Sequence, residues 1–441
     1  MTGPREPPQT IWGALRFVGP GFILSASVVG SGELIATTAL GARAGYVLLW
    51  IILLGCLVKV AVQLEYGRIT IARGLTTVQA WELSRRGRIG PWHWSNWILL
   101  CYLLAMFVGQ AGVLGGAAQV LTYALPGLPV AAAGLLLAAS ISLIQHRGHY
   151  STVETGALIF NGIFVAGVGY CLVAVQSSEF AFGWRELREA FHFRLPPETL
   201  ELALAAFGIT GIAAGEVVMY PYWCLEKGYA RFAGPPEESP EWRRRARGWI
   251  RVMTLDAFVA ALAYTFTTCA FYFLGAAVLS RQPELADGNA LLAQLSALFT
   301  RTLGERTRAA FLLCALVVLY STIFANTAAY SRLWADLATA VRRLRYASSA
   351  GKRRVIVLVT WGFPLGTALI YAAAQRPLFL VILMGVVNSA FLLVVAYQAV
   401  VFRYRRTAAE LQPHWLYDAA LWISLAAIGF VGFRSLLSLV G

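Results

Sequence analysis

Apolar runs long enough to cross a lipid bilayer alternate with short polar segments along the whole chain. A membrane-spanning helix needs about 20 mainly apolar residues. Eleven stretches meet this requirement: residues 14–42, 45–67, 95–124, 128–145, 153–176, 200–225, 249–279, 307–333, 354–374, 377–402 and 414–440. No segment between them has the character of a soluble domain. The pattern therefore predicts an all-α polytopic membrane protein in which residues 1–441 form a single transmembrane domain.

Two of the predicted spans are interrupted by glycine and an acidic residue. Span 1 contains Gly30-Ser31-Gly32-Glu33, and span 6 contains Ala214-Gly215-Glu216. A glycine costs about 1 kcal/mol in a helix interior relative to alanine, and a charged side chain at mid-bilayer costs at least about 2.5 kcal/mol. Lipid cannot satisfy unwound backbone, so such a stretch has to line a cavity or a packed interior. The alternative interpretation is close helix packing through small residues, with the acids paired or protonated.

The matching interruptions of spans 1 and 6 predict an internal repeat. Residues 14–176 would form the first repeat of five spans, residues 200–402 the second, and residues 414–440 one extra helix. Because five is an odd number, the second repeat would be inverted relative to the first. Interrupted helices at matching positions of two inverted repeats are the best sequence indication of a secondary transporter's substrate site. Such a protein works by alternating access around that site.

Composition and charge support a membrane location. The chain is 58% hydrophobic and 13% charged, whereas a soluble domain has about 25% charged residues. If the N-terminus is inside, the predicted inside segments hold 25 of the 36 Lys and Arg residues, as the positive-inside rule requires. We therefore expect a multi-pass protein of a bacterial cytoplasmic membrane, with its N-terminus inside and its C-terminus outside. The net charge of +14 then reflects basic loops facing anionic lipid, and no nucleic-acid partner is needed.

The run GPGFILSASVVGSGELIATTALGARAGYVLLW, residues 19–50, resembles the first two helices of the Nramp family of proton-coupled divalent-metal transporters. The similarity is in register through Gly19-Pro20-Gly21-Phe22 and again through Gly45-Tyr46. The resemblance implies the leucine-transporter fold, with spans 1 and 6 broken at the centre, and protons as the coupling ion. No other cofactor is expected, and a monomer is expected.

The chain departs from this family at the two breaks. The family's Asp-Pro-Gly-Asn signature in helix 1 is in register with Gly30-Ser31-Gly32-Glu33 here. The methionine that the family places in helix 6 is replaced within the Ala214-Gly215-Glu216 stretch. These differences leave the substrate open.

Two substrate classes suit the altered site. A small amino acid is favoured from the sequence, because exposed N–H groups at a helix break attract a carboxylate and glycines let a solute approach the backbone. The alternative is a hard divalent cation such as Mg²⁺ or Mn²⁺, held by the carboxylates of Glu33 and Glu216. A membrane enzyme is disfavoured, because no histidine falls in the interior of a span and the chain has no Gly-x-Ser-x-Gly motif.

Other polar or aromatic residues within the spans are candidates for supporting roles. Lys59, together with Glu33 and Glu216, is a candidate for proton coupling, although a buried ion pair would also explain it. Asn326 in span 8 and Asn388 in span 10 are candidates for substrate contact, or for hydrogen bonds between helices. The candidates for an aromatic gate below the site are Tyr220, Tyr222 and Trp223, which could instead form an interfacial belt.

Overall fold

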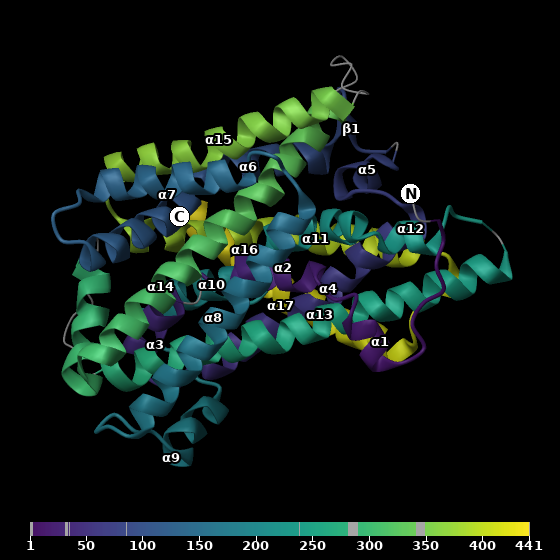
Figure 1. Ribbon diagram of the computed structural model, residues 1–441. Helices are drawn as coiled ribbons and strands as arrows, with labels where there is room; N and C mark the ends of the chain where they lie inside the picture. Colours follow the sequence, from purple (N-terminus) through teal and green to yellow (C-terminus); the bar gives the residue numbers. More distant parts are fainter. Residues whose placement is uncertain are drawn as a thin grey trace.

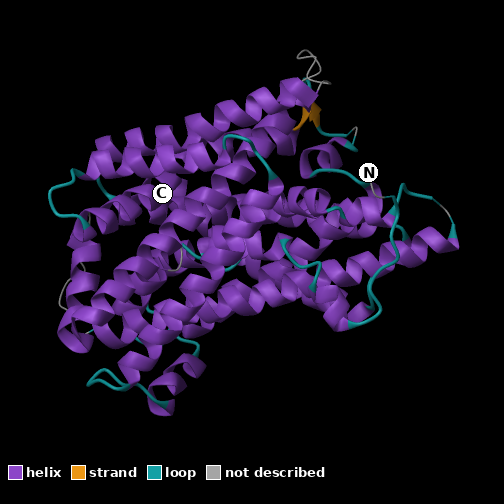
Figure 2. Ribbon diagram, viewed as in Figure 1, coloured by secondary structure: helices purple, strands orange, loops and turns teal. Residues whose placement is uncertain are grey.

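The computed structural model describes residues 3–30, 34, 36–84, 86–237, 239–280, 290–340 and 349–440. Within this part of the chain nearly all residues are helical (Figure 2), and the two strands, β1 (Arg88–Ile89) and β2 (Trp92–His93), pair as a short antiparallel hairpin. The long helices lie roughly along one direction, and the two chain termini lie toward opposite ends of the bundle (Figure 1). An odd number of crossings requires that placement of the termini.

The helices follow the predicted spans closely. The first half contains α1 (Ile11–Leu15), α2 (Pro20–Val28), α3 (Thr38–Ala44), α4 (Leu49–Arg73), α5 (Thr77–Glu82), α6 (Trp94–Ala124), α7 (Val130–Gln145) and α8 (Tyr150–Gln176). The second half contains α9 (Trp184–Leu187), α10 (Leu200–Ile209), α11 (Ala214–Lys227), α12 (Tyr229–Ala233), α13 (Pro240–Leu274), α14 (Ala290–Ala340), α15 (Ser349–Ala374), α16 (Pro377–Val401) and α17 (Trp415–Val440). Short 3₁₀ and π turns extend or connect these helices at residues 188–192, 197–199, 275–279, 402–406 and 409–411.

Nine helical stretches among the described residues are long and apolar enough to cross a membrane, and α7 is a shorter apolar helix of 16 residues. Predicted span 1 is not among them, because it is divided into α2 and α3, which have nine and seven residues. Together these elements account for the eleven predicted spans. Which end of the bundle faces the cytoplasm stays a prediction.

The first break follows α2. Pro20 occupies the first turn of α2, where its missing N–H is tolerated, and the helix ends at Val28. Val29 leaves helical geometry with φ −72° and ψ 83°, and the Gly30 N–H donates to the Val28 carbonyl at 2.8 Å. The candidate site residues Ser31, Gly32 and Glu33 lie outside the described residues. Regular α-helix resumes with α3 at Thr38.

The second break separates α10 from α11. Residues 210–213 are unwound, and Gly211 has φ +60°, a conformation that suits glycine. The sequence placed this interruption at Gly215-Glu216, which is wrong by a few residues, because both residues belong to the first turn of α11. Every residue from 202 to 224 is buried. The interrupted sixth span is therefore the central element of the bundle.

Lys59 of α4 satisfies the broken end of α10. Its Nζ donates to the carbonyls of Phe207 at 2.5 Å and Thr210 at 2.6 Å, and it lies 4.9 Å from the centre of the Phe207 ring. The last carbonyls of a helix lack intrahelical partners. Here the fully buried ammonium group of Lys59 donates the hydrogen bonds that these carbonyls would otherwise lack.

Candidate functional site

A small cavity lies where α2 ends and α11 begins. Its volume is about 10 Å³, which is close to the minimum that holds one water molecule. Its polar lining residues come from α2, α6, α11, α14 and α16: Ser27, Tyr102, Gln110, Glu216, Asn326, Tyr330 and Asn388. The thioether side chains of Met106 and Met384 line it as well. Two interrupted spans and three continuous ones thus meet around a single water-sized space.

Glu216 is the one carboxylate among the described lining residues. It is the third residue of α11, and its side chain is only 6% exposed. The carboxylate accepts hydrogen bonds from the backbone of Ala213 and of Glu216 itself, and the Ser27 side chain also interacts with it. A carboxylate in the first turn of a helix lies close to the unpaired N–H groups of that turn. Glu216 therefore places acceptor oxygens next to the cavity at the start of α11.

Asn326 has an amide group with no partner among the described residues. The residue is 1% exposed, and neither its Oδ1 nor its Nδ2 forms a hydrogen bond with that part of the chain. Leaving a buried polar group unsatisfied costs about 1–3 kcal/mol. The Asn326 amide is therefore available to a bound solute or water in the cavity.

Asn388 and Tyr102 hold each other in place across the cavity. The Tyr102 hydroxyl donates to Asn388 Oδ1 at 2.9 Å, and Asn388 Nδ2 donates to the Met384 carbonyl at 3.0 Å. The Tyr102 ring stacks on Phe391, with a centroid distance of 4.2 Å and an interplanar angle of 17°. The Asn388 amide oxygen is consequently fixed in orientation at the edge of the cavity.

The glycines of the two breaks make room for protein atoms. A Cβ added at Gly215 would come closer than 3.0 Å to the Tyr102 hydroxyl, and a Cβ at Gly30 would come closer than 3.0 Å to Thr322. Neither glycine lines the cavity, and Ala214 does not line it either; Ala213 does. The close-packing interpretation therefore describes Gly30 and Gly215 better than solute contact does.

The predicted gate residues are buried along α11, and two of them form hydrogen bonds. Tyr222 donates to Asp336 Oδ2 at 2.7 Å, and Thr76 also donates to that carboxylate. Tyr220 donates to Asp256 Oδ2 at 3.1 Å. These bonds join α11 to α5, α13 and α14, and they close the bundle at this end.

Trp223 and Asp256 extend this closed region. The Arg332 guanidinium lies 4.9 Å from the ring centre of Trp223 and forms an ion pair with Glu226. Asp256 of α13 also accepts hydrogen bonds from the backbone N–H groups of Gly19 and Gly21, both at 2.7 Å. The start of α2 is thereby tied to α13.

Lys59 does not line the cavity. Its charge acts on the Glu216 carboxylate, but its direct contacts are the carbonyls at the end of α10. Its suggested part in proton coupling stays a prediction.

Several lining residues were not singled out from the sequence. On α6, Tyr102, Met106 and Gln110 follow one another at four-residue spacing, as do Asn326 and Tyr330 on α14. Residues four apart lie on one helix face. Polar residues repeated at this spacing inside an apolar span are the signal that could have identified them.

Comparison with known proteins identifies the family. The family model described as "Natural resistance-associated macrophage protein-like", or Nramp, matches residues 21–438. The chain belongs to the Nramp family. This is a family of membrane transporters and not of enzymes.

Named Nramp relatives include the divalent metal cation transporter MntH of Bacillus subtilis, which is 30% identical over 165 residues, 36% of each chain. MntH of Xanthomonas campestris is 26% identical over 290 residues, which cover 64% of this chain and 61% of the relative. The Nramp chain thus spans less than two thirds of the length of these relatives. A mutant of the manganese transporter of Eremococcus coleocola superimposes with a TM-score of 0.58 at 12% identity, covering 99% of this chain and 97% of that one. The fold of this Nramp chain is therefore the leucine-transporter type, with spans 1 and 6 interrupted.

Proposed function

We propose that this Nramp chain is a secondary transporter of a divalent metal cation, bound in the cavity beside Glu216 and coupled to protons. The observation that carries the choice of a cation is the donor set of the cavity, where the carboxylate of Glu216 lies with the amides of Asn326 and Asn388. Oxygen donors of this kind are the ligands of divalent cations. The space between the described residues, about 10 Å³, also has the size of a single small guest. The printed names of the relatives, divalent metal cation transporters and a manganese transporter, support the same choice.

The amino-acid hypothesis relied on glycines that would widen the site. The space beside Gly215 is occupied by the Tyr102 hydroxyl, and the space beside Gly30 by Thr322. Gly30 and Gly215 therefore bring helices together and do not create room for a solute. Gly32, the other glycine of the first break, lies outside the described residues.

The donor set suits Mn²⁺ better than Mg²⁺. Glu216 offers carboxylate oxygens, and Asn326 and Asn388 offer amide oxygens, all of which are hard ligands. Met384 adds a polarisable thioether, which Mg²⁺ does not favour. No three His, Cys, Asp or Glu side chains come together within the described ranges. Selection would therefore depend on this mixture of one carboxylate, neutral oxygens and sulfur.

Transport would follow the alternating-access scheme of this fold. The hydrogen bonds of Tyr222 with Asp336 and of Tyr220 with Asp256 join α11 to its neighbours beyond the cavity, and in this proposal they form the closed gate. Release of the ion toward that end requires these bonds to break. The proton coupling in this proposal comes from the family resemblance, and a pH gradient tests it directly.

Binding and uptake of Mn²⁺, Mg²⁺ and alanine test the proposal. Purified protein should be stabilised against heat by Mn²⁺, since a ligand at a hundred times its dissociation constant contributes about 2.7 kcal/mol. Proteoliposomes should take up Mn²⁺, and faster when the outside is more acidic. Glu216→Gln should abolish both effects, and Met384→Leu should reduce the preference for Mn²⁺ over Mg²⁺.

Glu198→Gln is the matched control, because it removes the same charge from an exposed position far from the cavity. It should leave Mn²⁺ stabilisation unchanged. Stabilisation and uptake with alanine but not with Mn²⁺ would overturn the proposal. An equal effect of the two Glu→Gln substitutions would show that the cavity is not the binding site.

A further inference from the structure

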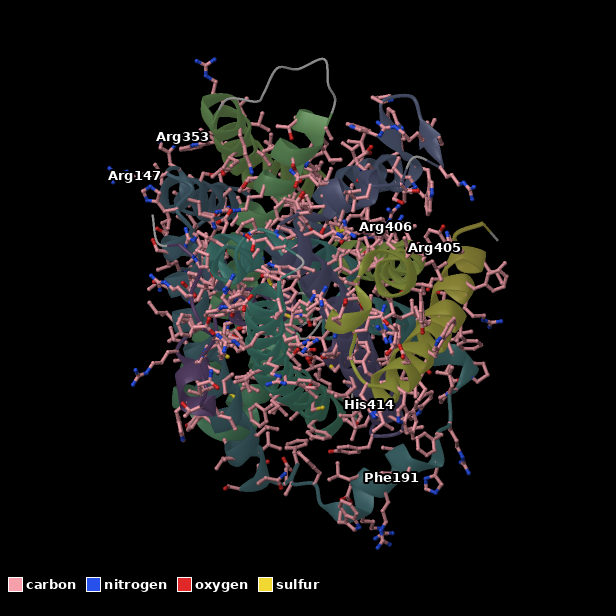
Figure 3. All side chains as sticks on the ribbon, turned by 90° about the vertical axis from the view of Figure 1, so that its right-hand side faces the viewer. Arg147, Phe191, Arg353, Arg405, Arg406 and His414 are labelled. Carbon is pink, nitrogen blue, oxygen red and sulfur yellow. The ribbon has the colours of Figure 1, made fainter. Side chains whose placement is uncertain are left out.

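A second hollow, of about 440 Å³, lies at the end of the bundle where the chain starts. One wall is the N-terminal segment from Pro7 through Ile11, and the other is the first half of α13, including Arg244, Arg247 and Arg251. Both walls lie toward the right-hand end of Figure 1. Figure 3 views this end directly and shows Arg147 and Arg353 projecting from the rim of the bundle. The hollow thus lies at the end that the distribution of basic residues predicts to be cytoplasmic.

One face of α13 changes from cationic to apolar along its length. Arginine occupies positions 244, 247 and 251, and the same face continues with Leu255, Phe258 and Leu262. The steps of three and four residues keep all six on one side of the helix. The three arginines are exposed, and so are Phe258 and Leu262, the latter by 74%. From residue 251 to residue 262 the helix rises about 16 Å, close to half the hydrocarbon thickness of a bilayer.

The arginines of this face keep most of their donors available. Arg251 has no hydrogen-bond or ion-pair partner in the described part of the chain. Arg244 pairs only with the exposed Glu6 at 3.1 Å, and Arg247 donates to the backbone carbonyl of Glu410 at 2.8 Å. A planar guanidinium group binds phosphate through two parallel hydrogen bonds. Three such groups beside one acid leave the hollow with a net positive charge.

The opposite wall completes an interfacial site. Trp12 of the short helix α1 is 80% exposed, and its neighbour Ile11 is also exposed. Tryptophan is enriched where apolar chains meet lipid headgroups, and α1 packs against α13. The hollow is therefore lined by three arginines and by Ile11. An exposed tryptophan follows Ile11 in α1, and an apolar track leads away along α13.

We propose that this hollow binds one anionic glycerophospholipid. Its phosphate would lie against Arg247 and Arg251, and an acyl chain would follow Leu255, Phe258 and Leu262. Basic pockets between helices at a cytoplasmic membrane surface are the usual sites for anionic headgroups. The lipid would bridge α1 and α13, the helix whose Asp256 holds the start of α2. It would thereby add a contact between the segment that precedes α2 and α13.

Lipid retention in native mass spectrometry tests this site. Protein is purified from vesicles of phosphatidylcholine with increasing phosphatidylglycerol, and the bound phosphatidylglycerol is counted. Removing one arginine next to an anionic headgroup weakens binding about fivefold. Arg247→Gln combined with Arg251→Gln should therefore weaken phosphatidylglycerol retention by about 25-fold, with unchanged elution on size exclusion as the check of folding.

Arg185→Gln combined with Arg188→Gln is the matched control, since it removes two exposed charges from the loop around α9. It should leave retention unchanged. An equal loss in both double variants would overturn the proposal, as would equal retention of phosphatidylcholine. Displacement of the lipid by millimolar inorganic phosphate would show a site for free anions and would also overturn it. Leu262→Ser should lower retention of long-chain but not of dioctanoyl phosphatidylglycerol. None of these measurements depends on which ion is transported.

Discussion

The contact between Gly215 and Tyr102 allows a prediction whose size follows from the coordinates. In Gly215→Ala the new methyl group meets the Tyr102 hydroxyl closer than 3.0 Å, whereas the ring atoms Cζ and Cε1 stay at 3.3 and 3.5 Å. The tyrosine cannot easily move away, because its ring stacks on Phe391 and its hydroxyl is bonded to Asn388. Overpacking of this kind costs about 1–3 kcal/mol. Replacing glycine by alanine in a helix returns about 0.5–1 kcal/mol, so the net loss lies between about 0 and 2.5 kcal/mol, centred on about 1 kcal/mol.

The clash involves one oxygen atom, so removing that oxygen should relieve it. Tyr102→Phe alone should cost about 1 kcal/mol, since it removes one buried hydrogen bond. Two independent losses would add up to about 2 kcal/mol. In the double variant the nearest remaining atom is 3.3 Å away, so its midpoint of thermal unfolding should be no lower than that of Gly215→Ala alone. This non-additivity is the signature of residues in direct contact.

The assay is thermal unfolding of the four proteins in one detergent, read from intrinsic tryptophan fluorescence. Gly162→Ala on α8 is the matched control, because a Cβ there has no neighbour within 4 Å. It should leave the midpoint unchanged or raise it slightly. If Gly215→Ala behaved like Gly162→Ala, or if Tyr102→Phe deepened its defect additively, the packing described for the break of span 6 would be refuted.

Three further substitutions test other parts of the fold. Lys59→Met leaves two carbonyls at the end of α10 without donors, so it should destabilise the protein by about 3 kcal/mol or more. It should also speed amide hydrogen exchange around residues 207–213. Unchanged exchange would contradict the capping role. Gly211→Ala forces a side chain into φ +60°, which should cost at least about 1–2 kcal/mol in a thermal unfolding assay; a neutral result would argue against the unwound geometry. Asp256→Asn turns an amide donor toward backbone N–H groups. Amide hydrogen exchange at residues 19–21 should therefore accelerate, while the rest of α13 keeps its protection. Protection equal to wild type at residues 19–21 would show that the carboxylate does not hold α2.

The sequence alone was sufficient to locate the membrane-crossing helices, because span length and hydropathy are local properties. Eleven apolar runs predicted the helices, and glycine beside an acid indicated which two would be broken. The exact position of the second break was harder to predict from the sequence. The helix stops at Ile209 where Lys59, about 150 residues earlier in the chain, captures the carbonyls of Phe207 and Thr210. A partner from another helix has no signature in the local pattern.

The sequence predicted only part of the candidate site, again because contacts between distant helices leave no local signature. Glu216, Asn326 and Asn388 line the cavity as expected of a site at the breaks, while Gly215 does not. Whether a glycine opens space for a solute or admits a neighbouring helix depends on what lies opposite, and here that is Tyr102. The choice of an amino acid followed from assuming open space. The volume of the cavity, which only the packed helices define, favours a single ion.

The ammonium group of Lys59 has a mechanical consequence for the transport cycle. It is covalently part of α4 and grips α10 through two short hydrogen bonds, so this clamp cannot dissociate as a dissolved cation would. As long as these two bonds hold, α4 and α10 move together. In the alternating-access scheme proposed above, bending within span 6 would then fall at the unwound residues 211–213, and α11 would be the half that moves relative to α4.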